Sequence, residues 1–135
     1  NIVSSGSFTE SGVDGQAAMI LTAASGAQSL LSTTMYADTP TVATISGSAA
    51  RIDIDTLFLM PSGFTLNFGD DRAPLIWRDE SGLVLRDGLA WEAVGVAQHV
   101  ADGLTESPLH PLDETLSLLH TLDEVRAQIT PGTVS

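Results

Sequence analysis

The sequence predicts an α+β fold: a largely antiparallel, open-faced mixed β-sheet of about six or seven strands, with helices packed on one face. Two observations lead to this class. Segments with strand patterning fill the first two thirds of the 135 residues, and two segments with helical patterning fill the last third. Strands first and helices last are typical of an α+β domain and not of alternating βαβ units. We expect a single domain over residues 1–135.

The strand signals are alternation and turn chemistry. Residues 51–55 alternate strictly, with Ile52 and Ile54 on one face, and residues 64–68 repeat this pattern. The short connection Ala24-Ser25-Gly26 between two apolar runs indicates a hairpin. The expected strands are 2–8, 16–23, 27–36, 41–46, 51–55, 64–68 and 75–77.

The two helical segments carry clear start and stop signals. Residues 88–102 have apolar side chains at helical spacing, and Gly103 is a natural stop. Pro111 suits the first position of the second helix, and Asp113 and Glu114 suit its first turn, where they face the positive end of the helix dipole. We expect its apolar stripe to pack on the sheet and Pro131-Gly132 to end it. The stripe comprises Leu112, Leu116, Leu119, Leu122, Val125 and Ile129.

The predicted sheet has more apolar surface than two helices can cover. In the second strand, Met19 and Leu21 lie on one face while Ala18 and Ile20 lie on the other. An uncovered apolar face of this kind needs a partner surface. We therefore expect a homodimer or higher homo-oligomer formed through the open face of the sheet.

The charge balance narrows the choice of partners. Seventeen acidic residues against five basic ones give a formal net charge of −12. Phosphate backbones and anionic lipids would repel such a chain, so we expect no nucleic-acid or membrane partner. All five bases are arginines, which excludes a lysine Schiff base or a P-loop lysine from this chain.

The chain has no cysteine, which excludes disulfides and cysteine-ligated metal centres and suits a reducing compartment. No apolar run is long enough to span a membrane. We expect a cytoplasmic protein. The start at Asn1, without an initiator methionine, suggests a trimmed or excised fragment.

Recognised catalytic and cofactor motifs are missing from the sequence. No glycine-rich dinucleotide motif, Walker A motif, nucleophile elbow, zinc-protease motif or EF-hand loop occurs. His99, His110 and His120 have no histidine three or four residues away, so we interpret them as solvated or helix-end residues and expect no metal site.

The acidic pairs and one tryptophan are weaker candidates. Asp53 and Asp55 share a strand face, and Asp70 adjoins Asp71. Paired carboxylates can act as a general acid and a general base. We favour the interpretation that the first pair lies on a solvated strand face and the second in a turn. Trp91 can line a ligand pocket, although a core or interface anchor is the commoner role. The polar side of the last helix would carry Asp123, Glu124 and Arg126. We expect no catalytic, cofactor-binding or metal-binding residue in this chain.

Ordered motifs along nearly the whole chain carry a family resemblance. They are residues 8–18, 37–41, 45–47, 51–54, 89–92, 106–115 and 122–126. Together they resemble the C-terminal domain of the glucose-fructose oxidoreductase, inositol dehydrogenase and rhizopine catabolism (Gfo/Idh/MocA) family, and within it the dihydrodiol dehydrogenase-like enzymes.

The resemblance implies a preceding Rossmann domain that binds NAD or NADP, and hydride transfer between the nicotinamide and a sugar, polyol or diol. In this family the second domain supplies part of the substrate pocket and the subunit interface. The family's catalytic lysine, in a Glu-Lys-Pro motif, and its helix with a conserved Asp and His have no counterpart here. We thus expect a substrate-pocket and oligomerisation domain that is inactive alone; the alternative is a self-standing, non-catalytic binding or assembly module.

Overall fold

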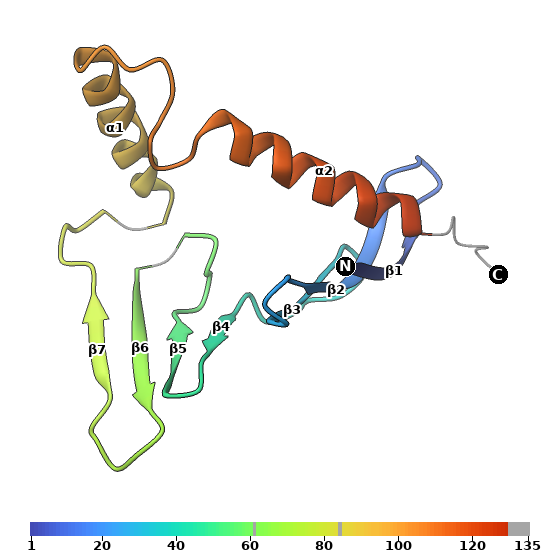
Figure 1. Ribbon diagram of the computed structural model, residues 1–135, viewed down its shortest axis with the longest axis horizontal. Coiled ribbons are helices and arrows are strands. Elements are labelled where there is room, and N and C mark those ends of the chain that lie inside the picture. The colour runs from blue at the N-terminus through green and yellow to red at the C-terminus, as the bar shows by residue number, and fades with distance from the viewer. Residues whose placement is uncertain (61, 84, 130–135) are drawn as a thin grey trace. The chain divides into compact units, whose positions relative to one another are not determined.

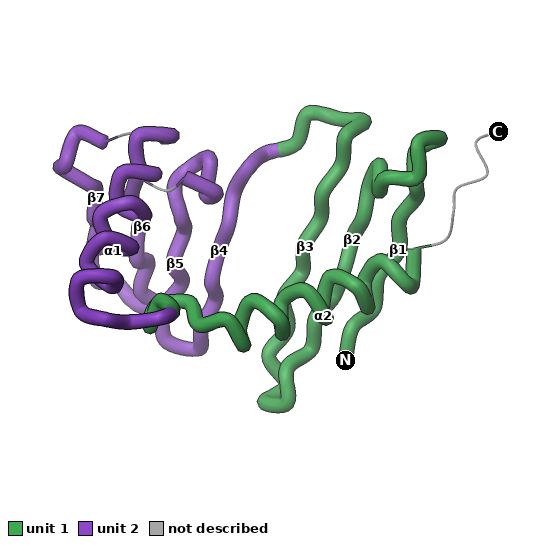
Figure 2. The backbone as a smooth tube through the Cα atoms, turned by 90° about the horizontal axis from the view of Figure 1, so that it is seen from above, with its two compact units in different colours: residues 1–39, 106–135 green, residues 40–105 purple. Residues whose placement is uncertain are grey.

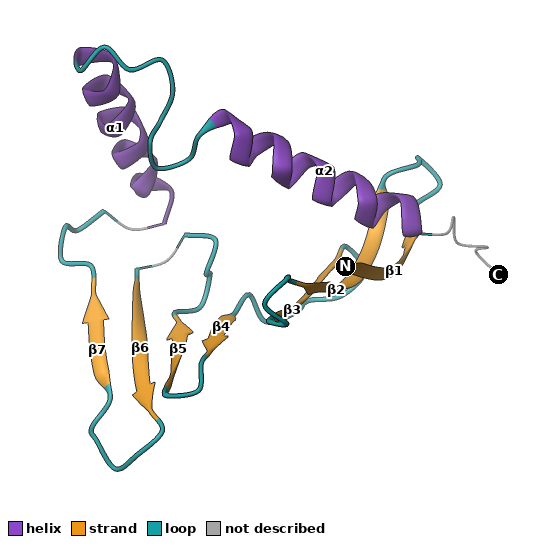
Figure 3. Ribbon diagram, viewed as in Figure 1, coloured by secondary structure: helices purple, strands orange, loops and turns teal. Residues whose placement is uncertain are grey.

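The computed structural model describes residues 1–60, 62–83 and 85–129 (Figure 1). The chain forms two compact units, one from residues 1–39 together with residues 106 onward, and one from residues 40–105 (Figure 2). Seven strands precede two α-helices in the described residues, which confirms the predicted α+β class (Figure 3). The expectation of a single domain stays a prediction.

The first unit is built on a three-stranded antiparallel sheet in the order β1-β2-β3. Its strands are β1 (Ile2–Phe8), β2 (Asp14–Thr22) and β3 (Gln28–Thr34). Both connections are hairpins with a glycine in the left-handed region, Gly12 at φ 80° and Gly26 at φ 88°. A positive φ causes little strain in glycine and considerable strain in residues with a side chain. For this reason the turns form at the glycines where the sequence predicts them.

Helix α2 (Leu112–Gln128) packs on β1 through its last two turns. Val125 and Ile129, at 4% and 6% exposure, form a buried cluster with Ala17 of β2. The Gln128 side-chain amide donates a hydrogen bond to the Ile2 carbonyl (3.1 Å) and accepts one from the Ser4 backbone amide (2.9 Å). Because β1 is the outer strand of its sheet, Gln128 occupies backbone groups that would otherwise be unpaired.

The predicted leucine stripe of α2 does not lie in the core of this unit, contrary to expectation. Of its six members only Val125 and Ile129 are buried, whereas Leu112, Leu116, Leu119 and Leu122 are at least half exposed. The physical reason is length. Seventeen helical residues span about 25 Å, whereas the outer strands of a three-stranded sheet are only about 10 Å apart. Pro131 and Gly132, expected to end this helix, lie outside the described residues.

Gly6 on β1 leaves no room for a side chain. A Cβ placed there would collide with the Gln16 carbonyl oxygen and lie 3.0 Å from the Ala17 Cα, both backbone atoms of the paired strand. We predict that Gly6→Ala lowers the unfolding free energy by about 1–3 kcal/mol, because the strands must separate to admit the methyl group. Urea denaturation measures this change. Gly95→Ala, in an open part of a helix, is the control and is expected to stabilise the chain slightly; equal losses in both variants would contradict the prediction.

The second unit is built on a four-stranded antiparallel sheet in the order β4-β5-β6-β7. Its strands are β4 (Ala43–Ser46), β5 (Ala50–Ile54), β6 (Gly63–Phe68) and β7 (Leu75–Arg78), followed by the 3-10 turn η1 (Leu85–Gly88) and α1 (Leu89–Ala101). Gly103, at φ 75°, follows the end of α1 as predicted.

The seven described strands thus form two sheets with only antiparallel pairs, whereas the sequence predicted one partly mixed sheet. The chain just before β4 has other partners. The Thr41 carbonyl accepts hydrogen bonds from the backbone amides of Leu57 (2.9 Å) and Phe58 (3.4 Å). Pro40, next to it, has no amide hydrogen to donate to a ladder.

The four-stranded sheet has one apolar and one polar face. Ile45, Ile52, Leu66 and Leu75 form a continuous cross-strand row on the apolar face. On the same face Phe64 and Trp77 stack, with ring centroids 5.7 Å apart. Within its unit α1 packs against η1 and makes no extended contact with these strands.

None of the described helices combines the length and the apolar character that crossing a membrane requires. The cytoplasmic location stays a prediction.

Candidate functional site

The aspartates on the polar face of the four-stranded sheet are held in local ion pairs. Asp53 accepts hydrogen bonds from Arg51 (2.8 Å), Asn67 (2.8 Å) and Thr44 (3.1 Å). The Arg51 hydrogen bonds hold the pKa of Asp53 below its ordinary value, against a smaller opposing effect of desolvation. Asp55 pairs with Arg78 at 3.4 Å. These contacts support the interpretation of a solvated strand face over an acid–base pair.

Three of the other charged candidates, Asp70, His110 and Arg126, also have structural partners. Asp70 pairs with Arg72 at 2.8 Å in the connection between β6 and β7. His110 lies 3.4 Å from Glu114 at the start of α2. Arg126 pairs with Asp14 at 3.1 Å, which ties α2 to the first hairpin. Nowhere in the described ranges do three potential metal ligands come together.

A pocket of about 320 Å³ lies in the second unit, beside the start of α1. We call it the α1 pocket. Three segments form it: the turn after β5, the chain after β7, and η1 with the first turn of α1. Its lining residues are Leu59, Met60, Ser62, Asp79, Leu83, Leu85, Arg86, Gly88, Leu89, Trp91 and Glu92. Trp91, which the sequence offered as a pocket residue or an anchor, lines this pocket and is 57% exposed.

Two leucines at the α1 pocket have an unfavourable backbone conformation themselves. Leu85 has φ 52° and Leu57 has φ 66°, and they are the non-glycine residues with positive φ in the described chain. Leu85 lines the pocket, and the Leu57 carbonyl accepts a 2.7 Å hydrogen bond from the amide of Met60, another lining residue. A leucine in the left-handed region of backbone conformation raises the free energy of the folded chain by about 1–2 kcal/mol. Strain of this kind clusters at ligand sites, which makes the α1 pocket the leading candidate.

Arg86 distinguishes the α1 pocket electrostatically. Arg51, Arg72, Arg78 and Arg126 each pair with an aspartate, whereas Arg86 has no ion pair among the described residues. Sequence analysis missed this residue. The sequence does not single it out, because Arg78 and Arg126 also have no aspartate two residues away and pair with aspartates that are distant along the chain.

Asp79 and Glu92 are the acidic residues of the α1 pocket. The Asp79 carboxylate accepts hydrogen bonds from the Ser81 amide (2.9 Å) and hydroxyl (2.7 Å). These bonds hold the pKa of Asp79 below its ordinary value. Glu92 lies in the first turn of α1 and makes no ion pair within the described chain. The groups left for a ligand are therefore chiefly Arg86, Glu92 and the Ser62 hydroxyl.

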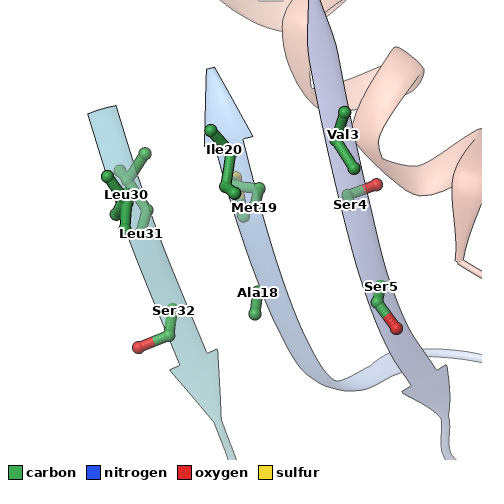
Figure 4. Close-up of a pocket in the computed structure, with 9 residues that line it drawn as sticks. All are labelled: Val3, Ser4, Ser5, Ala18, Met19, Ile20, Leu30, Leu31 and Ser32. Carbon is green, nitrogen blue, oxygen red and sulfur yellow. The ribbon is translucent and has the colours of Figure 1, made fainter. Parts of the chain in front are cut away.

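The three-stranded sheet presents a second candidate surface on the side away from its buried cluster, which we call the open face. The paired strands place Val3, Ile20 and Leu30 in one cross-strand row, with exposures of 54%, 40% and 75%. Figure 4 shows this region, a shallow hollow of about 520 Å³. The open face holds no charged side chain, although the whole chain carries 22. Its residues are Val3, Ser5, Ser7, Gln16, Ala18, Ile20, Leu30, Ser32 and Thr34.

Comparisons with known proteins agree with this architecture. No protein-family model matches the chain. The chain is 28% identical over 131 residues to trans-1,2-dihydrobenzene-1,2-diol dehydrogenase from Xenopus tropicalis, a match that covers 96% of the chain and 39% of that enzyme. A crystal structure of a mutant of KijD10, a 3-ketoreductase from Actinomadura kijaniata in complex with TDP-benzene and NADP, shares its fold with a TM-score of 0.73 at 18% identity. That match covers 97% of the chain and 40% of the reductase.

The chain thus spans about two fifths of the length of each protein that it matches. Both matched proteins are oxidoreductases. The two matches fit the resemblance carried by the sequence motifs, namely the C-terminal domain of a Gfo/Idh/MocA-like oxidoreductase.

Proposed function

We propose that this chain is the substrate-pocket and oligomerisation domain of an NAD(P)-dependent oxidoreductase that acts on a sugar, polyol or diol. The observation that carries the proposal is the match to a diol dehydrogenase over 96% of the chain. In the proposed parent enzyme a separate Rossmann domain of the same polypeptide binds NAD or NADP. The α1 pocket is the part of this chain that would contribute to the substrate site.

The exposed surface of the chain supports a role as part of a larger assembly. Among the described residues the buried apolar side chains are Ala17, Val125 and Ile129, whereas many large apolar side chains, among them Leu30 and Leu112, are more than half exposed. Exposed apolar surface of this kind is typical of a chain that packs against a partner.

The open face is the surface that we assign to self-association. It combines an exposed apolar row with small uncharged side chains, so a second copy can approach without desolvating a charge. Pairing of two equal faces around a twofold axis closes on itself and avoids open-ended growth. We propose a homodimer, or a higher oligomer built on it, through this face.

The cofactor assignment predicts that the chain and its parent polypeptide differ in their affinity for nicotinamide dinucleotides. The 135-residue chain alone is expected to bind neither NAD(H) nor NADP(H) with sub-millimolar affinity, because it lacks the glycine-rich turn at a helix N-terminus that holds a pyrophosphate. The parent polypeptide is expected to bind one of them. Isothermal titration of both proteins, with circular dichroism to check that the chain is folded, measures this difference. Tight dinucleotide binding by the chain alone would refute the division of labour that we propose.

A further inference from the structure

Aspartate is followed directly by glycine at three places in the chain: Asp14-Gly15, Asp87-Gly88 and Asp102-Gly103. In such a pair the backbone nitrogen of the glycine can attack the side-chain carboxyl carbon of the aspartate and close a succinimide ring. Glycine favours this reaction because it has no Cβ to hinder the approach and its backbone reaches many conformations. The reaction therefore depends on whether the local structure leaves the carboxyl group and the backbone amide free to meet.

The first pair is held by strand β2 and by helix α2. Asp14 and Gly15 belong to β2, and the Asp14 carboxylate forms an ion pair with Arg126 at 3.1 Å. Gly15 is buried, and its carbonyl accepts a 2.8 Å hydrogen bond from the Met35 amide. The ion pair and the strand pairing must break before the ring can close, so we expect Asp14 to be protected.

The pair at the end of α1 is held by two hydrogen bonds. The Asp102 carboxylate accepts one from the Gln98 side-chain amide at 2.9 Å. The Gly103 backbone amide, which is the attacking group in the ring closure, donates the other to the Val100 carbonyl at 3.0 Å. Both reacting groups are therefore engaged in the folded chain, and we expect Asp102 to be protected as well.

The pair Asp87-Gly88 has no comparable restraint. Asp87 is exposed, and its carboxylate has neither an ion pair nor a hydrogen bond among the described residues. It lies in η1, a 3-10 turn of four residues, and turns of this type have poor hydrogen-bond geometry. Leu85, at the start of the turn, has φ 52°, so opening the turn releases strain. A Cβ built on Gly88 meets nothing within 4 Å, which shows that the space beside the glycine is open.

We propose that Asp87 is a site of spontaneous isomerisation to isoaspartate. The Gly88 nitrogen forms a bond to the Asp87 Cγ, the bond from Cγ to its hydroxyl oxygen breaks, and a water molecule leaves with the amide hydrogen. A second water molecule then adds at the main-chain carbonyl carbon of Asp87, whose bond to the Gly88 nitrogen breaks. The chain now continues through the former side chain, and the former main-chain carbonyl becomes a free carboxylate. Addition of water at Cγ instead restores aspartate.

The isomerisation changes the wall of the α1 pocket. It inserts an additional carbon atom into the main chain between Arg86 and Leu89, which both line the pocket. The inserted atom shifts η1 relative to the first turn of α1, where Trp91 lies. The inference goes beyond the proposed function, because the reaction takes place whether or not the chain belongs to an oxidoreductase.

The test incubates the folded 135-residue chain at mildly acidic pH, where a protonated carboxyl group loses its oxygen as water most readily. Endoproteinase Asp-N cleaves before aspartate and not before isoaspartate. The peptide 87–101 should therefore disappear from the digest with time, and a fused peptide 79–101 should replace it. We expect isomerisation at Asp87 to be at least about ten-fold faster than at Asp14 or Asp102, the factor that one hydrogen bond to a charged group contributes.

Two controls separate the effect of structure from that of sequence. In urea the local contacts are absent, so the three sites should isomerise at similar rates. In the folded chain Gly88→Ala adds a methyl group that hinders the attack, and cleavage before Asp87 should then persist. The Gly88 φ of −57° and the open space beside it admit the methyl group without strain. Isomerisation at Asp87 that is no faster than at the other two sites in the folded chain, or that is as fast in Gly88→Ala, would overturn the proposal.

Trp91 fluorescence measures the effect on the pocket without a ligand. The chain has two tryptophans, so Trp77→Phe leaves Trp91 as the reporter. As the fused peptide accumulates, Trp91 emission should shift to longer wavelength, because the first turn of α1 loses its packing against η1. The same chain with Gly88→Ala should keep its emission over the same time. Unchanged emission after complete isomerisation would refute the effect on the pocket.

Discussion

Replacement of Ile129 by alanine is expected to lower the unfolding free energy of the first unit by about 2–5 kcal/mol. Ile129 is 6% exposed and packs with Val125 and Ala17 in the buried cluster between α2 and the three-stranded sheet. The cluster has only these three buried apolar members in the described chain, so few neighbours can move to fill the cavity. Since whole domains are stable by about 5–15 kcal/mol, a loss of this size threatens the fold of the unit.

Urea denaturation followed by circular dichroism measures the change, and Leu119→Ala is the control. Leu119 lies on the same helix but is 51% exposed, so its truncation should cost under about 1 kcal/mol in the isolated chain. The sequence alone ranked these residues together as members of one stripe. Equal losses of unfolding free energy in the two variants would mean that the whole stripe is buried, and would contradict the packing described above.

The second large effect is expected at the open face. Leu30→Asp should raise the dissociation constant of the proposed homodimer at least about 100-fold, because it places an unpaired carboxylate in the apolar row that the proposed interface would bury. Leu30 is 75% exposed in one chain and lies in the row with Ile20 and Val3. Light scattering during size-exclusion chromatography, at tens of micromolar protein, should show a dimer for the wild type and a monomer for the variant.

The control for this experiment is Leu109→Asp, which adds the same charge at a leucine that is 85% exposed in the connection between the helices. It should leave the dimer intact. The wild-type dimer should also tighten as salt rises, because two chains of net charge −12 repel each other at low ionic strength. A monomeric wild-type chain, or equal weakening by both substitutions, would show that the open face is not the interface.

Local patterns predicted the elements well and their assembly poorly. The alternation in residues 51–55 and 64–68 corresponds to β5 and β6, and the glycines at 26 and 103 lie at turns with positive φ. Such signals depend on each residue and its near neighbours. How much of an apolar stripe becomes buried depends on the width of the surface against which the helix packs. The periodicity of the sequence does not contain this width. For this reason α2 was recognised, while its buried end was not distinguished from its exposed leucines.

The candidate site was only partly accessible to sequence analysis for a similar reason. Trp91 could be singled out because a large aromatic side chain is rare in this chain. Nothing in the residue type marks Leu57 or Leu85 for positive φ, because leucine is not typical of that region. The strain follows from how the surrounding chain closes the turn. Arg86 became visible only when the ion pairs of the other arginines were assigned.

The pairing of β1 with the end of α2 also has a consequence for biosynthesis. Gln128 is 124 residues away from Ser4 along the chain, so the first unit is closed by its earliest and latest elements. A ribosome adds about 5–20 residues per second, so the first three strands exist for about 5–20 s before Val125 and Ile129 are made. During that interval the outer edge of β1 lacks its glutamine partner and the sheet lacks its buried cluster. The contiguous second unit, residues 40–105, has no such delay and can fold while β1, β2 and β3 still lack their helix.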